Sequence, residues 1–226
     1  KSGKIYDGKT GGEIVSDMIV KTCLSSKLNG TELVDQINTQ IAEIYKTLEI
    51  TKDTTLNAKY RFSGTFVCLR RVGTEIIITA LGDVGYRLNG VEAFTGQKQI
   101  DTDNAKIRAT YIKNTGDVTG SRRLLYPHLI KQFAYQNIPS HILGYGAIDG
   151  TPTPEKYVNL FYYPASLIKT IEIFTDGYYY SLPKTGQSIQ DWEEMIKKID
   201  QEDPHKYKTY KSTKSLDDRT VMTIDL

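Results

Sequence analysis

The stretch EIIITALGDVGYRLNG, residues 75–90, decides the fold class of this chain. It opens with the apolar run Glu75–Leu81, whose β-branched isoleucines are typical of a buried strand. Gly82-Asp83 interrupts that run. The residues that follow lead into Asn89-Gly90, a dipeptide that strongly favours a tight hairpin. The stretch therefore predicts consecutive antiparallel strands joined by short turns.

Further strands are predicted on both sides of this meander. Each is a short run rich in β-branched or aromatic residues and bounded by turn residues. The predicted strands cover Tyr60–Val72, with Gly73-Thr74 as its turn, and then Tyr157–Tyr162, Leu167–Phe174 and Arg219–Leu226.

Helical spacing of apolar residues, at intervals of three and four, precedes and separates the strand groups. It predicts helices over Glu13–Leu24, Thr31–Leu48 with Thr31 as N-cap, Ser121–Asn137 and Ile189–Ile199. The polar segment Phe94–Gly120 is expected to hold one strand, near Arg108–Ile112, and Gly144–Pro154 is expected to be a loop. The predicted class is α+β, a four-layer α-β-β-α sandwich of two mainly antiparallel sheets flanked by helices.

Composition excludes several kinds of protein. The 226 residues carry 29 basic and 27 acidic side chains, a balance that argues against a dedicated nucleic-acid binder. No apolar run approaches the length of a membrane span, so no membrane partner is expected. The chain has only two cysteines, Cys23 and Cys68, which are expected to be reduced core thiols in a cytoplasmic protein. His128, His141 and His205 lie too far apart for a zinc motif.

Aspartates at predicted strand ends are the residues most suited to chemistry. Asp176 follows one strand, Asp217 precedes the last one, and Asp83 follows the isoleucine-rich run. Carboxylates held at the ends of rigid strands suit Mg²⁺ and Mn²⁺, which prefer oxygen ligands. Taken one at a time, each is more simply interpreted as a turn residue.

Three motifs in order resemble the protein phosphatase 2C family, in a bacterial-like branch. Gly82-Asp83-Val84-Gly85 is similar to the family's Gly-Asp-Ser-Arg turn, with its last two residues altered. Thr175-Asp176-Gly177 looks like its Ser-Asp-Gly motif. The run 217–221, Asp-Asp-Arg-Thr-Val, is similar to its closing motif.

The resemblance implies a hydrolase, a metal-dependent protein phosphatase that cleaves phosphoserine and phosphothreonine with a metal-bound water and no protein nucleophile. It implies two or three Mn²⁺ or Mg²⁺ ions and a phosphorylated protein as substrate. Asp176 and Asp217 would bind one metal, and Asp83 would help to hold a weaker third ion. The implied organisation is a single domain over residues 1–226.

The family's first motif, an Asp-Gly that bridges two metals, has two possible positions. Asp7-Gly8 precedes Gly11-Gly12 at a spacing that differs from the family's usual one. The alternative is a bridging Asp upstream of Lys1, with the first residues as a variable loop. The family's N-terminal strand, which carries a phosphate-gripping Arg, has no counterpart before Asp7, so the domain is expected to lack it.

Three functional hypotheses remain at this point. The first is the phosphatase. The second is a pseudophosphatase or interaction domain with an incomplete metal site, suggested by the altered turn and the absent N-terminal strand. The third is a metal-free sandwich whose aspartates are plain turn residues.

Overall fold

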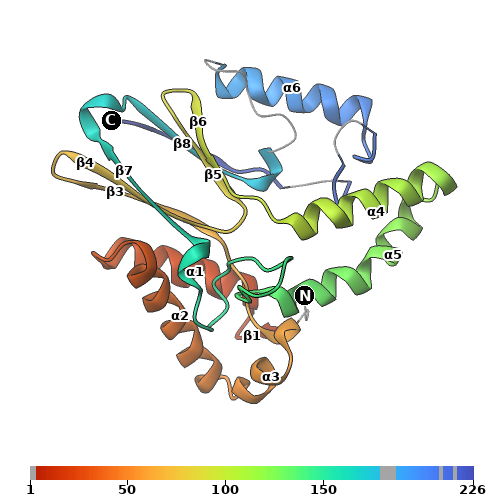
Figure 1. Ribbon diagram of the computed structural model, residues 1–226, viewed down its shortest axis with the longest axis horizontal. Coiled ribbons are helices and arrows are strands. Elements are labelled where there is room, and N and C mark those ends of the chain that lie inside the picture. The colour runs from red at the N-terminus through yellow and green to blue at the C-terminus, as the bar shows by residue number, and fades with distance from the viewer. Residues whose placement is uncertain (1–3, 179–186, 209–210, 216–217) are drawn as a thin grey trace. The chain divides into compact units, whose positions relative to one another are not determined.

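The computed structural model describes residues 4–178, 187–208, 211–215 and 218–226. The chain divides into two compact units, Lys1–Gly82 with Ile130–Ala165 and Asp83–Leu129 with Ser166–Leu226. Each unit contains one antiparallel sheet of three or four strands and its own helices (Figure 1). The single domain over residues 1–226 stays a prediction.

The sheet of the first unit has the strand order β3-β4-β7. Its strands are β3 (Phe66–Val72), β4 (Glu75–Leu81) and β7 (Val158–Pro164), and both pairings are antiparallel. β4 is central, and its residues from Ile76 to Leu81 are all buried. The predicted strand over 75–81 is therefore confirmed at both ends. The strand predicted from Tyr60 is shorter: Tyr60 belongs to the short helix η1 (Ala58–Tyr60), and β3 begins only at Phe66.

Helices α1 (Gly11–Ser25) and α2 (Gly30–Thr47) supply most of the core of this unit. Thr10 and Glu13 form a reciprocal capping box that starts α1. The N-cap of α2 is Asn29, so the prediction of Thr31 was wrong. The core joins the two helices to β3 and β4 through residues that include Val15, Leu33, Ile37, Ile41, Phe66, Cys68 and Leu81.

Smaller elements complete the first unit. They are β1 (Ile5–Tyr6), β2 (Lys9–Thr10), α3 (Thr51–Leu56), η2 (Gln132–Tyr135) and η3 (Glu155–Tyr157). The short helix η4 (Ala165–Leu167) begins at the last residue of this unit.

Both cysteines are free, as predicted: Cys68 is buried and Cys23 half-buried.

The loop over 144–154 is held by the buried carboxylate of Asp149. Its oxygens accept hydrogen bonds from Asn137 Nδ2 (2.9 Å) and the Thr151 amide (2.9 Å) and pair with Arg61 at 3.2 Å. The side-chain oxygen of Asn38, on α2, accepts from the Asp149 amide. Because its hydrogen bonds are made inside the unit, Asp149 ties the loop to the core and is structural.

The sheet of the second unit has the strand order β6-β5-β8-β9, antiparallel throughout. Its strands are β5 (Val84–Leu88), β6 (Val91–Thr95), β8 (Thr170–Thr175) and β9 (Val221–Asp225). Asn89 and Gly90, with φ of 52° and 75°, form the predicted hairpin turn. Gly85 lies opposite Phe174, and a Cβ at Gly85 would overlap that ring. The packing of Phe174 therefore explains why the last residue of the Gly82–Gly85 turn is a glycine.

The segment predicted to hold a strand near Arg108–Ile112 is instead α4 (Gln99–Thr115), so that prediction was wrong. Its buried face includes the polar residues Asn104 and Arg108, which hide the apolar periodicity. Helix α5 (Val118–Lys131) accommodates Pro127. Helix α6 (Ile189–Glu202) begins where it was predicted and extends past the predicted end at Ile199. No helix in the described ranges is both long and apolar enough to span a membrane.

Helix α6 contributes the fully buried Trp192, which packs with Phe174 of β8 and with Tyr178. Arg87 and Glu172 face each other across β5 and β8 and form a buried ion pair of 2.5 Å. The Arg87 guanidinium also stacks over the Trp192 ring.

The predicted class of two mainly antiparallel sheets flanked by helices is confirmed. The face-to-face packing of the sheets stays a prediction.

Candidate active site

Asp176 lies where β8 ends, as the first residue of the single turn η5 (Asp176–Tyr178). The strand end is fixed by the last described segment: the Thr175 amide donates to the Thr220 carbonyl, and the Thr220 amide donates to Thr175 Oγ1, both at 3.1 Å. The Asp176 side chain is half-buried. Its position at a rigid strand end is the one that the sequence predicts.

Gly177 brings a second strand-end segment against this turn. A Cβ atom at Gly177 would overlap the carbonyl oxygen of Asp218, so only glycine fits there. Asp218 therefore lies directly against the Asp176-Gly177 turn. Asp217, the other predicted ligand of this metal, lies outside the described residues.

The Asp83 carboxylate is paired with a positively charged side chain of the same unit. Its carboxylate forms an ion pair of 2.6 Å with Lys98, which precedes α4, and the two side chains are only 19% and 15% exposed. Burial alone would lower the pKa of the Lys98 ammonium, but the charges of Asp83, Asp101 and Asp176 outweigh it and raise that pKa above its ordinary value. The ammonium is therefore fully charged at neutral pH.

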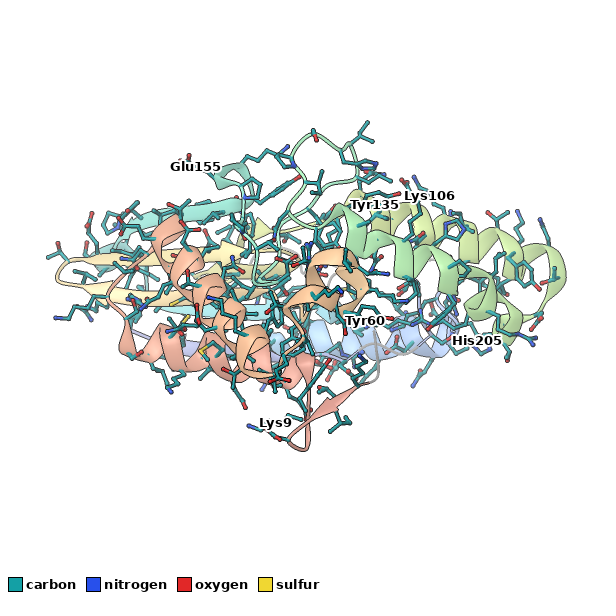
Figure 2. The ribbon with its side chains drawn as sticks, turned by 90° about the horizontal axis from the view of Figure 1, so that it is seen from below. Lys9, Tyr60, Lys106, Tyr135, Glu155 and His205 are labelled. Carbon is teal, nitrogen blue, oxygen red and sulfur yellow. The ribbon has the colours of Figure 1, made fainter. Side chains whose placement is uncertain are left out.

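Asp7 and Gly8 form the tip of the β1–β2 hairpin in the first unit. Both have positive φ, 47° and 79°, the pattern of a two-residue hairpin turn, and both are exposed. Figure 2 shows Lys9, the next residue, projecting away from the helices of its unit. This geometry is that of the plain turn. A ligand role for Asp7 and Gly8 stays a prediction.

Across the described ranges, no three His, Cys, Asp or Glu side chains form a group that could hold a metal. The donor chemistry of Asp176 suits a hard divalent ion, but only together with a ligand such as Asp217. Asp83 pairs with Lys98 in this structure, and a ligand role for Asp83 stays a prediction. Sequence reasoning missed Lys98, since a single lysine in a polar segment carries no signal.

These features define a class of protein: two antiparallel sheets with helices, and aspartates seated at strand ends. No protein-family model matches the chain, and no curated protein matches it.

Several solved structures of phosphatases are similar to this chain at low sequence identity. A bacterial serine phosphatase is 12% identical, with 96% of this chain and 81% of that chain covered and a TM-score of 0.49. The Mycobacterium tuberculosis serine/threonine phosphatase PstP/Ppp is 14% identical, with 96% and 83% covered and a TM-score of 0.49. The serine-threonine phosphatase 2C from Toxoplasma gondii is 16% identical, with 94% and 79% covered and a TM-score of 0.43.

Proposed function

We propose that this chain is a protein serine/threonine phosphatase that hydrolyses phosphoserine and phosphothreonine on proteins and requires Mn²⁺ or Mg²⁺. The observation that carries the proposal is the packing of Gly177 against the backbone of Asp218. It joins the Asp176 strand end to the segment whose preceding residue is Asp217. Two carboxylates from separate strand ends are the beginning of a site for a hard cation.

In this proposal Asp176 and Asp217 hold a divalent ion, with further ligands that include the bridging Asp of the family. Such ions supply a water of lowered pKa and neutralise the charge of the phosphate. The other residues of the chain position these two aspartates. Thr175 fixes the strand end through its hydrogen bonds with Thr220, and Gly177 admits the neighbouring backbone. The two free thiols agree with a reducing, cytoplasmic compartment.

The test is release of inorganic phosphate from a phosphothreonine peptide and from an aryl phosphate. We expect hydrolysis with Mn²⁺, its loss when EDTA removes the metal, and its recovery when Mn²⁺ is restored in excess. A heat-denatured sample is the control for contaminating phosphate. Hydrolysis that EDTA leaves unchanged, or no hydrolysis at saturating Mn²⁺, would contradict the proposal.

A second candidate function is a pseudophosphatase or interaction domain that keeps the fold without a complete metal site. The ion pair between Asp83 and Lys98 and the exposed hairpin tip at Asp7 are the observations that favour it. This candidate predicts a folded protein that neither binds Mn²⁺ nor hydrolyses either substrate. The same assay, combined with calorimetric titration of Mn²⁺, therefore separates the two candidates.

A further inference from the structure

Lys98 and Asp83 differ from the surface ion pairs of this chain in their burial. Lys46 and Glu43 are also 2.6 Å apart, yet their side chains are more than 60% exposed. An exposed pair of that kind contributes little to stability, because water screens it and both side chains lose freedom. Lys98 and Asp83 are below 20% exposed. Removing either one would leave the other's charge buried without compensation, which costs far more than breaking an exposed pair.

Two further carboxylates act on Lys98 in addition to that of Asp83. They are Asp101, in the first turn of α4, and Asp176, at the end of β8. These carboxylates come from three separate places in the second unit. A cation near several carboxylates favours their charged form.

An ammonium and a divalent ion are alternative cations for the Asp83 carboxylate. Both attract carboxylate oxygens, and Mg²⁺ or Mn²⁺ can bind through one or two carboxylates while keeping water as its other ligands. Lys98 has the advantage of being attached to the chain, so it does not depend on the metal concentration. A divalent ion at Asp83 would have to displace it.

We propose that the Lys98 ammonium is a built-in cation that takes the place of a divalent ion at Asp83, so that this carboxylate binds no metal. The expected third-ion role of Asp83 is thereby replaced by a residue of the chain. This inference goes beyond the proposed function and holds whether or not the protein hydrolyses phosphate, because it concerns occupancy at Asp83 alone.

The test is calorimetric titration of Mn²⁺ into the wild type, Lys98→Ala, Asp83→Asn and the double variant Lys98→Ala/Asp83→Asn. We expect Lys98→Ala to bind about one more Mn²⁺ per chain than the wild type. The double variant should return to the wild-type number, and Asp83→Asn alone should leave it unchanged. No gain in Lys98→Ala, or a loss of Mn²⁺ in Asp83→Asn alone, would overturn the proposal.

Two further variants guard against misfolding. Lys98→Arg keeps the positive charge and should bind as the wild type does. Lys98→Gln keeps the length without the charge and should gain the ion if Lys98→Ala fails to fold. Thermal unfolding gives a second readout: Mn²⁺ should raise the Tm of Lys98→Gln more than that of Lys98→Arg, because an ion bound only to the folded state stabilises it. Equal increases would also overturn the proposal.

Discussion

Asp176→Asn is expected to lower Mn²⁺-dependent phosphate release by at least about 100-fold while the protein stays folded. Asparagine has nearly the same shape as aspartate, so the turn at the end of β8 can form unchanged. It lacks the negative charge that a hard cation requires. The measurement is the steady-state rate at saturating Mn²⁺, with circular dichroism to establish that the fold is kept.

Asp225→Asn provides a matched control for this variant. Asp225 is exposed and lies opposite Thr170, at the end of the β8–β9 ladder away from Asp176. The same chemical change on the same sheet should alter the rate less than about twofold. Comparable losses in both variants would mean that the effect is general destabilisation and not metal binding.

Glu172→Ala is expected to cost about 3 to 5 kcal/mol of the free energy of unfolding. The substitution leaves the Arg87 guanidinium, which is 1% exposed, buried without the carboxylate that neutralises it. The variant should unfold at a clearly lower urea concentration, and the midpoint and slope of the urea transition measure the loss.

Glu43→Ala is the control, because Glu43 pairs with Lys46 at nearly the same distance on an exposed helix surface. Its cost should stay below about 1 kcal/mol. The double variant Arg87→Met/Glu172→Leu should recover much of the loss, since apolar side chains of similar size remove the unpaired charge. Equal costs for Glu172→Ala and Glu43→Ala would show that burial does not govern these pairs.

Local signals made much of the fold predictable. The strand over 75–81 was placed correctly because nearly all of β4 is buried, so its sequence is mostly apolar. The hairpin turn at Asn89-Gly90 was predicted correctly because this turn depends on two residues that tolerate positive φ. The start of α6 at Ile189 was also predicted correctly.

Helix α4 was missed because its buried face is explained only by distant residues. Arg108 is 2% exposed and donates to the carbonyls of His205 (2.8 Å) and Ser212 (3.0 Å) and to Ser215 Oγ (2.8 Å). A buried arginine that serves the loop after α6 looks like a surface residue in the sequence. The apolar period was therefore too weak to indicate a helix.

The candidate site divides in the same way. The place of Asp176 at a strand end followed from the apolar run before it. The partner of Asp83 could not be predicted, because Lys98 reaches it only after the β5–β6 hairpin folds back. Asp7-Gly8 is a common turn dipeptide, so its sequence alone did not distinguish a metal-binding motif from a plain turn. In the structure it forms an exposed hairpin tip, which is the geometry of a plain turn.

Calorimetric titration of Mn²⁺ into the wild type, Asp176→Asn, Asp217→Asn and the double variant addresses the shared cation most directly. If the two aspartates ligate one ion, each single variant should lose the same Mn²⁺ ion, and the double variant should lose nothing more. Binding heats that match the wild type in both single variants, or losses that simply add in the double variant, would contradict a shared site.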